Sequence, residues 1–147
     1  MSTKPKLNDK LINCVLEHIE HEVEKGSGAY DQNLWANIRT RGAQVLKCGT
    51  TGCFAGWACM LSTPREEWYE KFGLHKGWSN DVFNWADNAA EKLGLEEDEA
   101  NYLFDSCSGS KRFQLEKVKE RLENIREARE RGVYLSDVVN EKGRTHA

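Results

Sequence analysis

The chain has 147 residues, the usual length of one domain, and 39% of them are hydrophobic, including five Trp, five Phe and four Tyr. With 21 basic and 24 acidic residues, its net charge of -3 makes nucleic acid an improbable partner and gives no reason to expect an anionic membrane surface. The N-terminus lacks the apolar segment of a signal peptide, and no stretch approaches the roughly 18 apolar residues of a membrane span, so we expect a cytoplasmic protein. Five Cys, an odd number, favour a reducing compartment.

The first third of the chain predicts a tail and two helical segments. Residues 1–7 are expected to be a flexible tail. A helix is expected over 8–25, with Asn8 as its cap, Gly26 at its end and one apolar face made by Leu11, Ile12, Val15, Leu16, Ile19 and Val23. A second, short helical segment is expected over 30–38, with Asp31 as its cap and Leu34, Trp35 and Ile38 along its apolar edge.

The segment 53–61 predicts a helix buried on every side. It reads Cys-Phe-Ala-Gly-Trp-Ala-Cys-Met-Leu and contains no charged residue. Thr50 or Thr51 is the expected cap. Gly56 weakens the helix by about 1 kcal/mol relative to Ala, so we expect a neighbouring helix to approach closely at this position. The chain therefore predicts an all-α, compact multi-helix domain around a buried central helix.

The remainder predicts further helices, each bounded by its own capping residues, and no strand. One helix should begin with a capping box at Thr63, Pro64 and Glu66 and stop at Gly73, and the next should run from Ser79 to Leu93 and end at Gly94. Acidic residues at 96–99 open another helix, 111–131 forms a long amphipathic one, and 133–139 adds a short docked helix. The single helical domain spans 8–140, and 141–147 is a second flexible tail.

The string Cys48-Gly-Thr-Thr-Gly-Cys53 precedes the central helix and is the strongest candidate for chemistry. Free amides at a helix N-terminus can hold an anion, and two glycines allow its close approach. We therefore expect a small pocket for an anionic ligand such as a nucleotide, with Trp rings that stack on a flat ligand. Its predicted lining is Trp35, Cys48, Gly49, Thr50, Thr51, Gly52, Cys53 and Trp57.

Three other interpretations of the same string stay open. Cys53 could be a nucleophile at a helix N-terminus, with His75 as the only His inside the domain that follows it. Cys48 and Cys53 could be zinc ligands or a redox pair, although the other cysteines form no second pair at zinc-binding spacing. The turn could also be purely structural, because Cys is among the most buried residue types. No metal and no cofactor is predicted.

Three strings together resemble a set of small uncharacterised phage and bacterial proteins. They are Tyr30-Asp-Gln-x-x-Trp35, Cys48-Gly-Thr-x-x-Cys53-x-Ala-Gly-Trp57-Ala58, and Ala90-x-x-Leu93-Gly94-Leu95 with Ala100-x-x-Leu103-Phe104-Asp105. The resemblance implies a prokaryotic or phage setting and lends no catalytic residue. We expect a non-enzymatic binding protein that inhibits a host defence factor or sequesters a small anionic ligand. The alternative is a Cys53-dependent hydrolase or transferase, and oligomer formation stays open.

Overall fold

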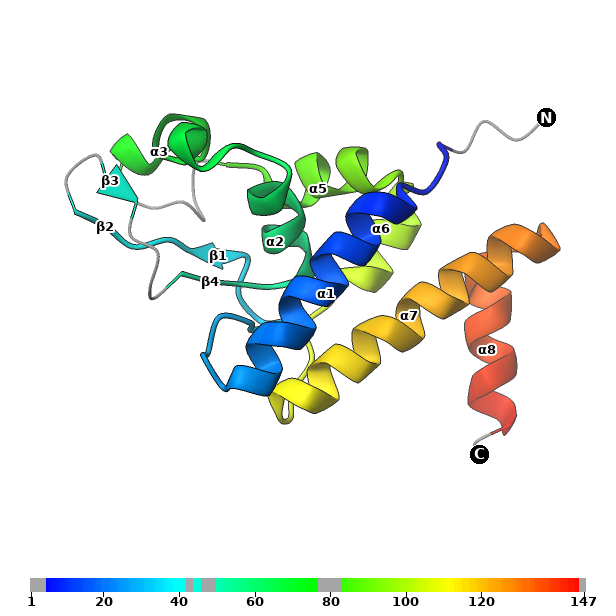
Figure 1. Ribbon diagram of the computed structural model, residues 1–147. Helices are drawn as coiled ribbons and strands as arrows, with labels where there is room; N and C mark the ends of the chain where they lie inside the picture. Colours follow the sequence, from blue (N-terminus) through cyan, green and yellow to red (C-terminus); the bar gives the residue numbers. More distant parts are fainter. Residues whose placement is uncertain (1–4, 42–43, 46–49, 77–82, 146–147) are drawn as a thin grey trace.

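The computed structural model describes residues 5–41, 44–45, 50–76 and 83–145, and most of them lie in helices (Figure 1). The helices are α1 (Asp9–Lys25), α2 (Phe54–Leu61), α3 (Trp68–Lys71), α5 (Trp85–Leu93), α6 (Glu97–Leu103), α7 (Lys111–Arg131) and α8 (Leu135–Thr145). Two-residue strands form two antiparallel pairs, β1 (Ala36–Asn37) with β4 (Thr51–Gly52) and β2 (Thr40–Arg41) with β3 (Gln44–Val45). The mostly helical, compact fold is as predicted, but the strands are not.

Helix α1 forms as its sequence predicts. The Asn8 side chain accepts a hydrogen bond from the Leu11 amide (3.1 Å), and Gly26 ends the helix with a left-handed backbone at φ 67°. Ile12, Val15 and Ile19 are fully buried. The segment before α1 is held against the domain, because the Asn8 amide donates to the Leu93 carbonyl (2.9 Å).

Helix α2 packs against α1 and α5, and all of its residues from Phe54 to Met60 are buried. Gly56 is a close-approach site, as expected, but the neighbour is not a helix. A Cβ on Gly56 would lie 1.7 Å from the Trp35 carbonyl oxygen and 3.7 Å from the Ala36 Cβ. The backbone just before and within β1 therefore passes directly over the first turn of α2.

Helix α7 crosses one side of the domain and contacts α1, α6 and α8 (Figure 1). Its predicted apolar seam is buried and consists of Leu115, Val118, Leu122 and Ile125. Near its C-terminal end, Arg129 pairs with the buried Glu99 of α6 (2.6 Å) and donates to the Gly94 carbonyl (2.8 Å). Among the described residues, no helix combines the length and apolar character needed to cross a membrane.

Several predicted elements differ from the structure. Residues 30–38 form a turn and β1 rather than a helix, because their backbone pairs with 51–52. Thr63 caps no helix: Arg65–Glu67 forms a 3₁₀ turn before α3, and the buried Thr63 hydroxyl has no partner among the described residues. Asn84 rather than Ser79, which lies outside the described residues, caps α5. Helix α8 continues to Thr145, beyond the short helix expected over 133–139.

Candidate functional site

The turn that leads into α2 is tied to the segment after α1 by backbone hydrogen bonds. The Gly52 amide donates to the Ala29 carbonyl (3.0 Å), and the Cys53 amide donates to the Leu34 carbonyl (2.8 Å). Strand pairing sets Ala36 opposite Gly52. The predicted site residues 50–53 are therefore part of a backbone scaffold that joins two distant segments of the chain.

The N-terminus of α2 is capped by Cys53 and not by a threonine. The Cys53 Sγ accepts a hydrogen bond from the Gly56 amide (3.4 Å), and the side-chain oxygen of Gln32 accepts one from the Phe54 amide (3.2 Å). Thr51 donates its hydroxyl to the Gly28 carbonyl (3.1 Å) instead, and Thr50 is buried. The amides of residues 52, 53, 54 and 56 are thus all bonded within the protein, which leaves none of these four amides for an anion.

Gln32 is the polar centre of this scaffold and is only 2% exposed. Its side-chain oxygen also accepts a hydrogen bond from the Tyr30 hydroxyl (3.0 Å). Its side-chain nitrogen donates to the carbonyls of Leu103 and Asp105, each at 3.3 Å, and its backbone amide donates to the Gln114 side chain (3.0 Å). A single buried amide side chain therefore connects the N-terminus of α2, the end of α6 and the turn at 31–35.

The Cys53 thiol is not arranged for nucleophilic attack. It is 2% exposed, and burial raises the pKa of this thiol to about 11, although the Gly56 amide partly offsets the effect. His75 lies elsewhere, on the 3₁₀ turn Leu74–Lys76, where it contacts the Glu70 carboxylate (3.7 Å) and the Tyr69 ring. Cys53 and His75 contact different residues and do not contact each other, so they do not form a nucleophile–base pair in this structure.

The part of the chain that the structure describes contains no cluster of three or more potential metal ligands. Cys48 and Gly49, which the sequence places in the candidate pocket, lie outside the described residues. The described free thiols of Cys53 and Cys59 are both buried, and burial raises the pKa of Cys59 as well, to about 12. Neither thiol has the low pKa that metal binding or redox chemistry favours.

A cleft of about 210 Å³ opens beside this scaffold, between the 32–35 turn and residues 104–106. Trp35 and Phe104 meet edge to face along it, with ring centroids 6.2 Å apart, and Cys53 and Asp105 also line it. We call it the Trp35 cleft. Of the described candidates, Trp35 and Cys53 meet there. Trp57 does not line the cleft, because its ring packs at a tilt against His18 of α1 (4.2 Å between centroids) and its indole nitrogen donates to the Ala29 carbonyl.

The polar residues of the cleft and its walls were not predicted from the sequence. Asn33 and Cys107 exchange two hydrogen bonds, Asn33 Nδ2 to the Cys107 carbonyl (2.9 Å) and the Cys107 amide to Asn33 Oδ1 (3.0 Å), which fix one wall. A usable signal was present: Gln32 and Asp105 both belong to the strings that carry the resemblance. Parts of all three strings, Tyr30 to Trp35, Cys53 and Leu103 to Asp105, converge at this cleft and its scaffold.

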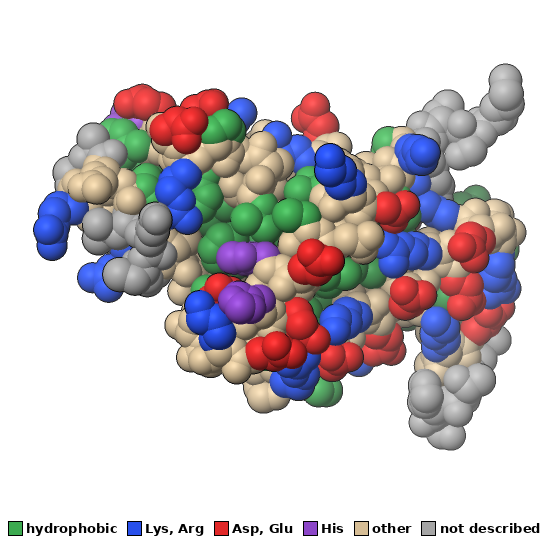
Figure 2. Space-filling view, in the orientation of Figure 1, with side chains coloured by type: hydrophobic (Ala, Val, Ile, Leu, Met, Phe, Trp, Pro, Cys, Tyr) green, Lys and Arg blue, Asp and Glu red, His purple; other side chains and the backbone are tan. Residues whose placement is uncertain are grey.

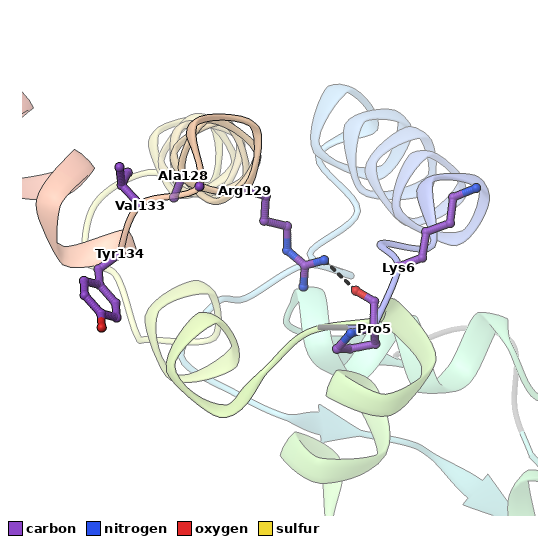
Figure 3. A pocket seen from close by; sticks show the side chains of 7 residues that line it. Pro5, Lys6, Ala128, Arg129, Val133 and Tyr134 are labelled. Carbon is purple, nitrogen blue, oxygen red and sulfur yellow. Dashed lines mark hydrogen bonds between the residues drawn. The ribbon is translucent and has the colours of Figure 1, made fainter. Parts of the chain in front are cut away.

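A larger hollow of about 570 Å³ lies between the N-terminal segment and the end of α7 (Figure 3). Arg129 reaches across it to the Pro5 carbonyl, while Tyr134 points away from Arg129. The guanidinium already binds Glu99 through two of its nitrogens. The Arg129 guanidinium is therefore committed to contacts that hold the chain together.

The described part of the face in Figure 2 carries interspersed acidic and basic side chains over α1 and α7. The described part of this face lacks the continuous basic stripe typical of nucleic-acid-binding proteins. Comparison of the chain with models of known families, with curated proteins and with solved structures gives no match.

Proposed function

We propose that this chain is a binding protein and that the Trp35 cleft is its recognition site. The observation that carries the proposal is the convergence of the three resembling strings at one cleft built on the Gln32 scaffold. The cleft is preorganised, because Gln32 and Asn33 have their side-chain hydrogen bonds satisfied within the protein. A rigid cleft with an aromatic wall favours affinity, since little conformational entropy is lost on binding.

The chemistry of the cleft favours a side chain of a partner protein over a nucleotide. Its volume of about 210 Å³ is below the 300 to 1,000 Å³ typical of small-molecule pockets. Asp105 is the charged residue in its lining, and the amides at the start of α2 are already bonded. An aromatic wall beside a carboxylate suits an uncharged or basic side chain, whereas an anion would meet an unfavourable charge.

The scaffold role extends to α2, which we propose as the central helix of the fold. Helix α2 follows directly after Cys53, which lines the cleft, and its residues from Phe54 to Met60 are buried. Gly56 allows the backbone at 35–36 to lie against the helix. The small side chains in α2 are then required by packing rather than by chemistry. This account favours binding over a Cys53-dependent hydrolase or transferase, because the thiol is buried and its pKa is raised.

The resemblance to phage and bacterial proteins implies the class of partner. A chain encoded by a phage would act in the cytoplasm of its host, and a binding protein would there inhibit a host protein such as a defence factor. The cleft is small, so its occupant would be one anchoring side chain within a wider contact surface.

Affinity capture from cells of the native host tests this proposal with three variants. Trp35→Ala removes the aromatic wall, and Asp105→Arg blocks the rim through an exposed position with little effect on folding. Tyr134→Ala is the control, because Tyr134 is 79% exposed and lies outside the cleft. We expect one protein to be retained by wild type and by Tyr134→Ala and to be lost with both cleft variants. Retention by all four chains would contradict the proposal.

A further inference from the structure

A groove of about 360 Å³ lies between α6, α7 and α8, away from the Trp35 cleft. Its charged lining residues are Lys117, Glu120 and Arg121 of α7 and Lys142 of α8, and Tyr102 of α6 and Val139 of α8 also line it. We call it the Arg121 groove. Figure 1 shows α8 turning back from the end of α7 at an angle.

Arg121 is a buried cation whose charge is not matched by a carboxylate among the described residues. It is 9% exposed, and its Nη1 donates to the carbonyls of Asp105 (2.8 Å) and Leu103 (3.5 Å) at the end of α6. These two carbonyls accept hydrogen bonds from one of the three guanidinium nitrogens. Within the described residues the other two nitrogens have no acceptor. These two nitrogens are not sealed from solvent, so they are open to an anionic ligand.

The other polar groups of the groove can complete an anion site. The Tyr102 hydroxyl accepts a hydrogen bond from the Asn124 side chain (2.8 Å), so its own proton remains for donation to a ligand. Lys117 contacts Glu120 (3.4 Å), whereas Lys142 contacts Glu127 (3.5 Å) and donates a hydrogen bond to the side-chain oxygen of Asn124. The Lys117 pair is a surface pair, which contributes only about 0 to 1 kcal/mol, so Lys117 can turn to an anion at small cost. Lys142 is held in place by Asn124 and Glu127 and adds its charge to the groove from that position.

We propose that the Arg121 groove binds the phosphate monoester group of a small molecule. The lining contains three cations and the Glu120 carboxylate, a net charge of about +2. A phosphate monoester carries about -1.5 to -2 at neutral pH and offers three acceptor oxygens to the guanidinium, the ammonium groups and the Tyr102 hydroxyl. The volume of 360 Å³ lies within the range of small-molecule sites, and the Tyr102 ring and Val139 form an apolar wall for the remainder of the ligand.

Isothermal titration calorimetry with AMP, inorganic phosphate and adenosine tests this site on the full chain. We expect AMP and phosphate to bind saturably and adenosine not to bind. Equal affinity for AMP and phosphate would assign recognition to the phosphate alone, and tighter AMP binding would show that the apolar wall takes part. Failure of both anions to bind, or binding of adenosine as tight as that of AMP, would overturn the proposal.

Three lysine variants locate the site without disturbing Arg121, whose loss would also uncap α6. Lys117→Gln and Lys142→Gln should each weaken AMP binding about threefold or more, since each removes one cation from the groove. Lys119→Gln is the matched control, because Lys119 lies on the same helix and contacts Glu20 and Glu116 outside the groove. If Lys119→Gln weakens AMP binding as much as the other two variants do, the site is not this groove.

Discussion

The Trp35 carbonyl oxygen lies 1.7 Å from the position that a Cβ atom on Gly56 would occupy. This contact joins the edge of the Trp35 cleft to the first turn of α2. Any side chain at position 56 must push the 35–36 backbone away from the helix, and real Cβ atoms do not approach other atoms so closely. The glycine is therefore required by packing, and the cleft depends on it.

Gly56→Ala should destabilise the domain by about 1–3 kcal/mol, the usual cost of overpacking a close contact, and lower Tm by several degrees. Gly143→Ala is the matched control, because Gly143 is also helical and a Cβ there meets no atom within 4 Å. The control should leave Tm unchanged or raise it, since Ala is the better helix former. Thermal unfolding followed by circular dichroism measures both. Equal Tm values for Gly56→Ala and wild type would exclude the close contact.

Replacing Gln32 with Leu, which is similar in size, should show how much the hydrogen bonds of Gln32 contribute to stability beyond its packing. Gln32→Leu leaves the Phe54 amide and the Tyr30 hydroxyl without their shared acceptor, which should cost at least about 1–3 kcal/mol. Gln44→Leu is the control, because Gln44 is exposed on β3, and it should change stability by less than about 0.5 kcal/mol. Urea unfolding gives both free energies. A Gln32→Leu protein as stable as wild type would show that the network contributes nothing.

His18 should make the protein less stable in mild acid. Burial lowers the pKa of His18, although the Glu22 carboxylate opposes the shift, and the His18 Nε2 is buried without a partner among the described residues. The unfolded chain therefore binds a proton more readily than the folded one. This contribution to stability is complete above the ordinary pKa near 6.5 and is lost as pH falls through the lowered folded pKa.

Urea unfolding between about pH 5 and pH 7.5 tests this effect in His18→Leu and in His21→Leu. The first variant should show a weaker loss of stability in acid than wild type, and the second should retain the full loss, because His21 is exposed. Identical pH profiles for wild type and His18→Leu would contradict the assignment.

Much of the helical fold could be predicted from the sequence, because its signals are local. Asn8 and Gly26 bound α1, Gly94 ends α5 and Gly132 ends α7, and each acts through its own backbone conformation or side chain. The 30–38 segment could not be predicted in the same way. Its apolar residues suit a short helix, but pairing with residues 51–52 and the hydrogen bonds of Gln32 to residues 71 and more positions away determine its shape.

The candidate site was predictable only in part, for a related reason. The string around Cys53 was recognised, yet its partners lie far away in the sequence, and the sequence does not show which amides a distant side chain will cap. Gln32 supplies one cap of α2 across 22 positions, and Phe104 completes the cleft from the end of α6. Because long-range contacts bond the amides at the start of α2, the segment that the sequence suggests as an anion site is a structural scaffold, and the cleft lies beside it.

The rates at which iodoacetamide alkylates the individual cysteines at neutral pH test most directly whether the Cys53 segment is a scaffold. Peptide mass spectrometry measures each rate in the folded protein, with Cys14 as the internal reference because it is exposed. We predict that Cys53 reacts far more slowly than Cys14 and reaches the same rate only after unfolding, since it is buried and its pKa is raised to about 11. Alkylation of Cys53 faster than Cys14 in the folded protein would contradict the account and favour a nucleophilic cysteine.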